Sequence, residues 1–394
     1  MIPLRTADVA DHRGLLRAVE AALDGGDPLA LGFEPDAADR VPEGTAAVIA
    51  TSGSTGVPKR VVLSASALRA SAEATAARIG TGRWLLALPA GYVAGLQVLV
   101  RSSLAGTRPV ALRGRFAVGS FLDAVTELER GPALTSLVPA QLSTLVDAAD
   151  DAEVRAALRR FEAVLVGGQA LPAPLRERAA ELGVRLVRTY GSSETSGGCV
   201  YDGIPLDGTA VRVVDGELQI AGPTLADGYL GDEPQTADRF VRDAGARWYR
   251  TGDLGDVAGG VVRVAGRADN VIVSGGVNVS LDRVEAVVRG LRGFGSAVVA
   301  GVEDDRWGES PGVVVLRAEL AGPGSSSRAG EPAGEEPLGA VRMAVGAVLG
   351  VAARPSIVLP VDEMPMLASG KPDRTAIRRM LREAARGSGS RGAG

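Results

Sequence analysis

Cysteine and histidine are almost absent from this sequence of 394 residues, which contains one of each, Cys199 and His12. A single cysteine excludes intrachain disulfides, CxxC redox chemistry and cysteine-rich metal sites. A single histidine argues against a Ser-His-Asp triad and against a multi-histidine zinc site. The GxxxxGK[ST] phosphate-loop pattern does not occur either. Any catalysis must therefore rely on hydroxyls, carboxylates, backbone amides, arginine and lysine.

Long apolar runs are also missing, since no stretch reaches the roughly 18–20 residues that a membrane span needs. The first residues, MIPLR, lack the basic-then-apolar pattern of a signal peptide. The 43 basic and 47 acidic residues give a net charge of −4 and form no long basic tract, so nucleic-acid binding is not predicted. We expect a soluble, cytoplasmic protein of two domains.

The chain contains only two lysines, Lys59 and Lys371, but 41 arginines. Arginine supplies almost all of the generic surface charge, whereas a lysine offers a compact point charge that reaches a single oxygen. Both lysines lie beside proline or glycine in loop-like segments. They are candidates for functional positions, although two lysines can also remain in such a sequence by chance.

Short apolar segments that predict buried strands alternate with helical segments in the first half of the chain. The predicted strands are 46–50, 61–63, 84–88, 133–138, 163–166 and 184–187, and the predicted helices include 64–79 and 93–104. This alternation predicts an α/β fold with a largely parallel sheet.

The sequence pattern changes from about residue 205. Short β-type segments separated by turns predict a small β-rich subdomain there. These strands are 210–214, 217–221, 248–250 and 261–264. A compact α+β unit follows, with helices 281–291 and 338–349 and strands 297–301 and 313–317. The low-complexity segments 321–337 and 386–394 are predicted to be disordered.

The segment 51–59, TSGSTGVPK, carries the strongest chemical signal. Glycines allow backbone N–H groups to converge on an anion, hydroxyls add donors, and Lys59 adds a full positive charge. A flexible surface loop is the alternative reading. The flanking strands, the density of hydroxyls and the terminal lysine favour a site for a polyphosphate.

Three further segments each have an ordinary turn as their alternative reading. YGSSET, residues 190–195, offers an aromatic face for a base and a carboxylate for Mg²⁺. YRTGDLG, residues 249–255, places Asp253 in a glycine-flanked turn, where it can accept two hydroxyl hydrogen bonds. GRADN, residues 266–270, lies where the β-rich region meets the C-terminal unit and predicts a hinge.

In this order, and with SGKPDR at residues 369–374, these segments resemble the signature motifs of the adenylate-forming superfamily over residues 45–380. That family includes acyl- and aryl-CoA ligases, luciferases and peptide-synthetase adenylation domains. The resemblance implies a large N-terminal α/β and β-barrel-like domain, residues 1–267, and a smaller mobile α+β domain, residues 268–385. A hinge near 267–270 joins them, and residues 386–394 form a tail.

The reaction that the resemblance implies has two steps, with ATP, Mg²⁺ and coenzyme A as cofactor and co-substrates. A carboxylate attacks the α-phosphate of ATP to give an acyl-adenylate and pyrophosphate, and a thiol then displaces AMP. A lysine delivered by domain closure would stabilise the charge that develops between carboxylate and phosphate. No enzyme nucleophile is needed, which agrees with the shortage of cysteine and histidine.

Roles follow from the resemblance residue by residue. The pyrophosphate would be held by Thr51, Ser52, Gly53, Ser54, Thr55, Gly56 and Lys59. The adenine side would be lined by Gly167, Gly168 and Gln169, with Tyr190 stacking nearby, and Gly191 and Ser192 would also bind the cofactor. Thr195 would contact the α-phosphate, Glu194 would hold Mg²⁺, and Asp253 and Arg267 would bind ribose. Asp269 would be the hinge, Ser274, Gly275 and Gly276 would line the pantetheine channel, and Lys371 would bridge the reacting groups.

Residues 88–107 and 189–208 resemble the compact actinobacterial o-succinylbenzoate–CoA ligases of menaquinone biosynthesis. Arg101 fits this resemblance, because it lies in an otherwise apolar helix and could pair with the second carboxylate of such a substrate. A solvated helix face is its alternative. Tyr92 replaces a frequent histidine beside the acyl pocket, and Asn270 and Arg60 replace a frequent aspartate and glycine.

Two other functions stay open at this point. One is a ligase or stand-alone adenylating enzyme of secondary metabolism with another acid or acceptor. The other is a nucleotide-binding protein without catalysis, against which Lys59, Glu194, Asp253 and Lys371 argue. Small-molecule partners are expected, and a homodimer is left open.

Overall fold

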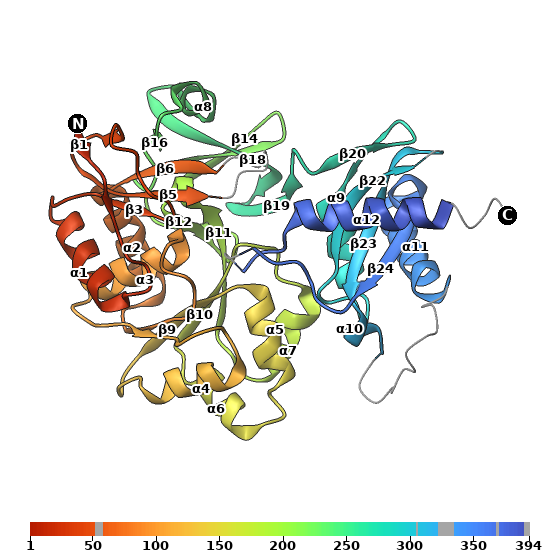
Figure 1. Ribbon diagram of the computed structural model, residues 1–394, viewed down its shortest axis with the longest axis horizontal. Coiled ribbons are helices and arrows are strands. Elements are labelled where there is room, and N and C mark those ends of the chain that lie inside the picture. Colours follow the sequence, from red (N-terminus) through yellow and green to blue (C-terminus); the bar gives the residue numbers. More distant parts are fainter. Residues whose placement is uncertain (52–57, 305, 322–334, 368–369, 390–394) are drawn as a thin grey trace. The chain divides into compact units, whose positions relative to one another are not determined.

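A computed structural model describes residues 1–51, 58–304, 306–321, 335–367 and 370–389 (Figure 1). The predicted phosphate-binding residues 52–56 and most of the low-complexity segment 321–337 lie outside the described residues. Contacts divide the chain into two compact units. Unit 1 comprises residues 1–171, 176–251 and 256–263, and unit 2 comprises 172–175, 252–255 and 264–394.

The largest sheet of unit 1 has seven strands and is mainly parallel, as the alternating pattern predicts. Its strands are, in order, β13 (Ile204–Pro205), β12 (Gly197–Tyr201), β11 (Leu186–Ser192), β10 (Ala163–Val166), β9 (Ala133–Leu137), β7 (Arg83–Leu86) and β8 (Val110–Ala111). Strands β9 and β10 are buried along their whole length, which is typical of parallel strands covered on both faces.

Helices accompany this sheet. They are α1 (His12–Leu23), α2 (Ala65–Ile79), α3 (Val93–Leu104), α4 (Val118–Thr126), α5 (Pro139–Asp147), α6 (Ala152–Arg159) and α7 (Ala173–Glu181). Helix α2 begins after Ser64, whose hydroxyl accepts a hydrogen bond from the Ala67 amide at 3.2 Å. Buried leucines of α1, α2 and α3 share one core with the sheet.

Smaller sheets complete this part of the chain. One has the order β16 (Gly228–Tyr229), β6 (Lys59–Ser64), β5 (Thr45–Thr51), β3 (Leu29–Leu31) and β2 (Arg5–Thr6). Another contains β14 (Ala210–Val214), β15 (Glu217–Ala221), β18 (Ala246–Ala258), β17 (Phe240–Asp243) and β19 (Val261–Arg267), with α8 (Glu233–Arg239) before β17. Strands β1 (Ile2–Pro3) and β4 (Arg40–Val41) form a short pair.

Unit 2 is built on one five-stranded sheet with helices on both faces. The strands are β21 (Val277–Ser280), β20 (Val271–Ser274), β23 (Gly308–Leu316), β22 (Val298–Asp304) and β24 (Ile357–Val361). Alternate residues of β22 and β23 pack against α9 (Leu281–Arg289) and α11 (Glu335–Leu349), while the others pack against α12 (Arg374–Gly389). The short helix α10 (Arg317–Ala321) follows β23.

Two predictions of local structure are wrong. The predicted disordered tail is helical as far as Gly389, because each residue added to an existing helix gains a backbone hydrogen bond. The predicted disorder of 321–337 stays a prediction, because only residue 321 and residues 335–337 are described there, as parts of α10 and α11. Asp253 lies within β18 rather than in a turn, since ladder pairing with neighbouring strands outweighs local turn preference.

None of the helices in the described parts of the chain is long and apolar enough to cross a membrane.

Candidate active site

The two ends of the predicted phosphate loop meet where the antiparallel strands β5 and β6 of unit 1 are connected. Strands β5 and β6 are antiparallel, and Thr51 and Lys59 are opposite each other as their last pair. The Thr51 hydroxyl donates to the Lys59 carbonyl at 3.3 Å. The hairpin therefore places Lys59 beside the start of the glycine- and hydroxyl-rich segment that it closes in sequence.

Tyr229 connects Lys59 with the predicted metal ligand Glu194. Strand β16 pairs with β6, so that Tyr229 lies opposite Val61, two residues after Lys59. The Lys59 ammonium Nζ is 5.6 Å from the centroid of the Tyr229 ring, and the tyrosine hydroxyl donates to Glu194 Oε1 at 2.9 Å. Burial, followed by the neighbouring Glu194 carboxylate, raises the pKa of Tyr229, so this hydroxyl remains a donor.

Hydrogen bonds from two helices, α2 and α3, hold the turn that carries Glu194 and Thr195. It is a single 3₁₀ turn (Ser193–Thr195) that ends at Ser196 in a left-handed conformation with φ of 53°. The Ser196 carbonyl accepts hydrogen bonds from Ser71 of α2 at 3.1 Å and from Gln97 of α3 at 2.8 Å. These two polar side chains are themselves buried, so they fix the backbone of the turn in a dry environment.

Thr195 is fully buried, and its hydroxyl is occupied within the turn. The hydroxyl donates to the Gly197 carbonyl at 2.7 Å and accepts from the Ser192 amide at 2.9 Å. Its predicted contact with an α-phosphate therefore stays a prediction. Nearby Cys199 is also fully buried, and burial raises the pKa of its thiol to about 12, so it is an inert structural residue rather than a nucleophile.

The residues predicted for the adenine side come from neighbouring strands of the seven-stranded sheet. Gly167 follows β10, Tyr190 lies in β11, and these strands are parallel. Ligands of open α/β sheets bind beyond such carboxyl ends. Gly191 has a φ of 158°, and a Cβ there would overlap the Gly197 carbonyl, so only glycine fits the strand pairing at this point. Gly168 and Gln169 continue from the end of β10.

Arg101 is not on a solvated helix face, because only 7% of it is exposed. Its guanidinium lies 5.1 Å from the Trp84 ring centroid and donates to the Tyr201 hydroxyl at 3.4 Å. Burial lowers its pKa, and its Nε atom has no hydrogen-bond partner among the described residues. These aromatic contacts accommodate the charge inside the apolar helix, while its pairing with a substrate carboxylate stays a prediction. Tyr92, half-buried, precedes the first turn of the same helix.

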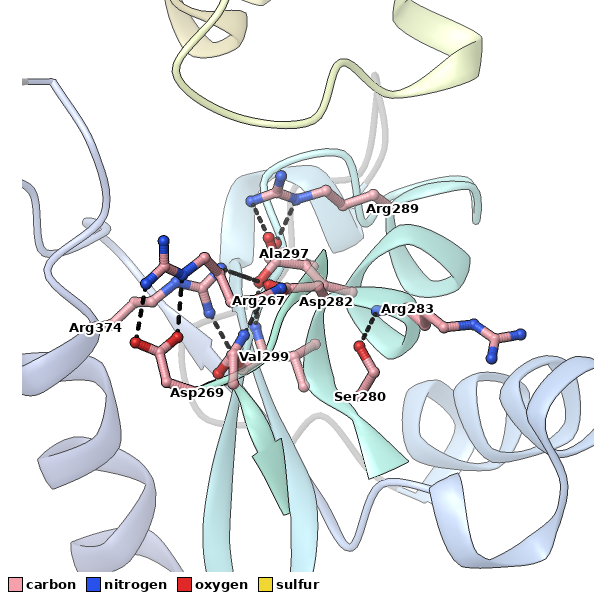
Figure 2. A network of polar contacts seen from close by, with 11 residues as sticks. Arg267, Asp269, Ser280, Asp282, Arg283, Arg289, Ala297, Val299 and Arg374 are labelled. Carbon is pink, nitrogen blue, oxygen red and sulfur yellow. Dashed lines mark hydrogen bonds and ion pairs between the residues drawn. The ribbon is translucent and has the colours of Figure 1, made fainter. Parts of the chain in front are cut away.

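Arg267 and Asp269, from the predicted ribose and hinge residues, contact each other in unit 2 (Figure 2). Arg267 donates to both carboxylate oxygens of Asp269 at 3.0 Å, and its Nη1 is 3.4 Å from Asp253 Oδ1. A planar guanidinium fits a carboxylate in this two-pronged way. The arrangement presents a cation between two carboxylates at the end of β19.

Lys371 is exposed and lies in a tight turn before α12. Its carbonyl accepts from the Leu367 amide at 2.8 Å, and an isolated bridge joins Met366 to Pro372. Of the predicted pantetheine channel residues, Ser274 ends β20, and a Cβ on Gly275 would overlap the Trp307 indole. Gly276 follows in the turn to β21 with a φ of 80°.

The donor set at Glu194 fits Mg²⁺ held largely by a nucleotide. The described residues contain no group of three or more His, Cys, Asp or Glu that could bind a metal by themselves. Mg²⁺ commonly uses one or two carboxylates together with substrate phosphates and water. Glu194 would supply such a carboxylate, oriented by Tyr229.

Sequence reasoning missed the residues that support the site. Ser71, Gln97 and Tyr229 in unit 1 and Arg374 in unit 2 lie outside every predicted motif role. Ser71 and Gln97 are 125 and 99 positions from Ser196, so no local pattern could reveal their contacts. Only buried polar residues in α2 and α3 offered a signal, since such groups need partners.

A model of the AMP-binding enzyme family matches residues 5–230. The probable 2-succinylbenzoate–CoA ligase of Mycobacterium tuberculosis (strain H37Rv) is 40% identical over 387 residues, covering 94% of this chain and 96% of that protein. The 2-succinylbenzoate–CoA ligase of Salmonella typhimurium is 33% identical over 71% of this chain, which spans 60% of that protein.

Solved structures are similar as well. The o-succinylbenzoate CoA synthetase of Bacillus subtilis, in complex with its acyl-adenylate intermediate, has a TM-score of 0.69 and 25% identity, covering 92% of this chain and 80% of that chain. The amide bond synthetase of Marinactinospora thermotolerans has a TM-score of 0.70 at 24% identity, covering 95% and 83%. The latter likeness concerns the fold alone.

Proposed function

This chain belongs to the AMP-binding enzyme family, and on that premise we propose that it is an acid–CoA ligase acting on o-succinylbenzoate. It would join the acid to AMP at the expense of ATP and then transfer the acyl group to the thiol of coenzyme A. The choice of acid rests on the 40% identical ligase, which is matched along nearly its whole length. A cytoplasmic location is part of the proposal.

One geometric observation carries the activating step. Lys59, Tyr229 and Glu194 meet at the end of the β5–β6 hairpin where Thr51 pairs with Lys59, and both the cation and the carboxylate contact the same tyrosine. A nucleoside triphosphate needs such a pair, because the cation faces phosphate oxygens and the carboxylate faces a phosphate-bound metal ion. Bound Mg²⁺ would neutralise charge on the phosphates.

In the first step a carboxylate oxygen of the acid attacks the α-phosphorus of ATP. The new C–O–P linkage forms as the bond to pyrophosphate breaks, and the leaving group carries away the electron pair. Lys59 would stabilise the departing pyrophosphate, and Lys371 would stabilise the charge between carboxylate and α-phosphate. Asp253 and Arg267 would hold the ribose, and Tyr190 would face the adenine.

In the second step the thiolate of coenzyme A attacks the acyl carbon, and AMP leaves with the electrons of the broken C–O bond. This step needs no nucleophile from the protein. Ser274, Gly275 and Gly276 would line the approach of the pantetheine arm. Asp269, which lies between β19 and β20, would be the hinge, as the family resemblance implies.

A panel of carboxylic acids tests the substrate. Acid-dependent release of pyrophosphate is measured with and without coenzyme A, and thioester formation is followed by mass spectrometry. We expect o-succinylbenzoate to give the highest kcat/KM and turnover that depends on coenzyme A. Adenylation without transfer to coenzyme A would favour a stand-alone adenylating enzyme, and a better acid in the panel would replace the proposed substrate.

Lys371 tests catalysis itself. Replacement of Lys371 by alanine should lower the rate of acyl-adenylate formation by at least about 100-fold, while ATP affinity stays within a few-fold, since the lysine acts on the developing charge. Equal activity of this variant would refute the assigned role. A chain that binds ATP but releases no pyrophosphate with any acid would be a nucleotide-binding protein instead.

A further inference from the structure

Asp282, near the start of α9, holds the hinge segment 267–270 within unit 2. Its carboxylate accepts the Arg267 backbone amide at 2.7 Å and the side-chain amide of Asn270 at 2.7 Å. The Leu281 amide also donates to the Asn270 carbonyl at 3.0 Å. The first turn of α9 is therefore fastened to both ends of the segment that was predicted to be the hinge.

Arg374 fastens the Lys371 turn to the same helix. It is the first residue of α12 and follows Lys371 by three positions. Its Nη2 lies 2.9 Å from Glu285 Oε2 and 3.8 Å from Asp282 Oδ1, and its Nη1 donates to the Val299 carbonyl at 2.9 Å. Figure 2 shows this arginine reaching toward the group around Asp282 and Val299. The same guanidinium thus contacts both acidic residues of α9.

Glu285 makes this connection rigid. It is 6% exposed, and its second oxygen lies 2.9 Å from Arg289, while the Val299 amide donates to the oxygen that Arg374 contacts. A buried carboxylate with all its partners in place has one arrangement, because displacing any partner leaves a charge unpaired. Arg289 in turn donates to the Ala297 carbonyl at 2.7 Å.

The chain between Lys371 and Arg374 is also fixed. Asp373 donates its amide to the Pro365 carbonyl at 2.8 Å, and its carboxylate caps α12 by accepting the amides of Thr375 and Ala376. These contacts hold residues 371–373 against the start of α12. Lys371 and the hinge segment are therefore joined through three side chains, Asp282, Glu285 and Arg374, which we term the α9 bracket.

We propose that the α9 bracket fixes the position of Lys371 relative to α9, so that Asp282 and Arg374 are positioning residues for Lys371. The inference rests on the proposed function, because the role of Lys371 comes from it. The Lys371 ammonium would then reach the reacting groups without a separate rearrangement of residues 371–374. Misplacing a catalytic group by about 1 Å can cost about 100-fold in rate, so such coupling matters for the first step.

The bracket also accounts for asparagine at position 270. The Asn270 amide is a donor to Asp282, whereas an aspartate there would set two carboxylates against each other. Asn270→Asp should therefore loosen the hinge end of the bracket and leave the Arg374 end in place. An asparagine at position 270 therefore supplies the donor that the Asp282 carboxylate needs.

A double-mutant cycle tests the proposal. Acid-dependent ATP–pyrophosphate exchange is measured for Arg374→Met, Lys371→Ala and the double variant, with ATP affinity determined separately. We expect Arg374→Met to lower the exchange rate at least about tenfold with ATP affinity within about twofold, and to change the residual rate of the Lys371→Ala background by less than about twofold. Additive losses would overturn the inference, because Arg374 would then act independently of Lys371.

Further variants keep the outcomes separable. Asp282→Asn preserves shape and should give a smaller loss that is likewise absent in the Lys371→Ala background, and an additive loss would again overturn the inference. Arg317→Met breaks an exposed ion pair with Asp362 in the same unit and should leave exchange unchanged. Normal exchange in Lys371→Ala alone would contradict the proposed function, whatever the cycle shows.

Discussion

The Glu194 turn of unit 1 and the α9 bracket of unit 2 both hold candidate catalytic residues, but they do so by different chemistry. The turn is fixed mainly by uncharged donors, Ser71, Gln97 and Tyr229, which come from three separate elements. The bracket is fixed by charged groups that lie on α9 and at the start of α12. The turn is therefore held largely without buried charge, whereas the bracket depends on charges that compensate one another.

The difference predicts different weaknesses. Loss of a neutral donor leaves one polar atom unsatisfied, whereas loss of a buried charge leaves its partners uncompensated. Removal of one buried carboxylate from the α9 bracket should therefore lower the free energy of unfolding of unit 2 by more than removal of one neutral donor lowers that of unit 1. The peripheral ion pairs of Arg267 are half-exposed and should contribute little to stability, because water and salt screen them.

The largest effect is expected for Glu285→Ala, which leaves Arg289 and Arg374 without their shared carboxylate. Arg289 is buried, and burial already lowers its pKa. We expect the free energy of unfolding of unit 2 to fall by about 3–5 kcal/mol. Hydrogen exchange of unit 2 peptides measures the loss. Asp362→Ala, which breaks only the exposed pair with Arg317, is the control and should cost less than about 1 kcal/mol.

Labelling of the Cys199 thiol measures the opening of unit 1 separately in that experiment. This residue is the one cysteine of the chain and is fully buried in unit 1. In Glu285→Ala, its thiol should stay protected from labelling reagents while unit 2 peptides exchange faster. Simultaneous loss of protection in both units would contradict the independence assumed in the comparison.

The next effect is expected for Tyr229→Phe, which keeps the ring near Phe240 and removes the donor to Glu194. A hydrogen bond to a charged group contributes about 1.5–3 kcal/mol, so unit 1 should lose stability in this range. The Mg²⁺ concentration for half-maximal pyrophosphate exchange should also rise several-fold, because the carboxylate loses its orientation.

Tyr201→Phe is the matched control for that experiment, since it removes a buried hydroxyl that bonds to Thr75 and Arg101 rather than to Glu194. It should destabilise unit 1 without changing the Mg²⁺ requirement. An equal shift in both variants would mean that Tyr229 acts through general stability alone.

A comparable or smaller loss of stability is expected for unit 1 at alkaline pH. The Cys199 thiol has an ordinary pKa near 9.0 and a pKa of about 12 when folded, so between these values the unfolded state loses a proton that the folded state keeps. Stability therefore falls as pH rises through this window. Near pH 10.5 the fall in wild type should exceed that in Cys199→Ala by about 1–2 kcal/mol, measured by urea unfolding. Parallel curves would contradict the raised pKa.

The smallest effect is expected for Arg267→Gln. Its pairs with Asp253 and Asp269 are half-exposed, so unit 2 should change by no more than about 1 kcal/mol. The change should shrink further at high salt. Nucleotide affinity, measured by calorimetry, should fall much more than stability, which would separate a ligand-binding role from a structural one.

Much of the fold was accessible from the sequence where one signal dominated. Helix α3 has the bounds that its apolar run predicts, and the strands β9 and β10 follow from continuous buried residues. The errors concern segments where composition and pairing disagree. Glycine-rich YRTGDLG indicated a turn, yet hydrogen bonding to neighbouring strands makes it part of β18.

In the candidate site, too, local sequence patterns indicated some residues, while others depend on long-range contacts. Residues with unusual local composition, such as the lysine-terminated loop and the hinge segment, could be proposed from their motifs. The contacts of Tyr229 and Gln97, and those of Arg374 within the SGKPDR motif, could not be proposed in this way, because they join residues 35, 99 and 89 positions apart. Such long-range contacts depend on how strands and helices pack, which a local pattern does not encode.

The contact between Lys59 and Tyr229 has a spectroscopic consequence. Reductive methylation with ¹³C would give each lysine of this arginine-rich chain a dimethylamine signal, and the two lysines belong to different units. Methyl groups on Lys59 would feel the ring current of the tyrosine, and those on Lys371 would report on a different unit of the chain. Two resolved resonances would thus follow the surroundings of each unit's lysine in the same spectrum.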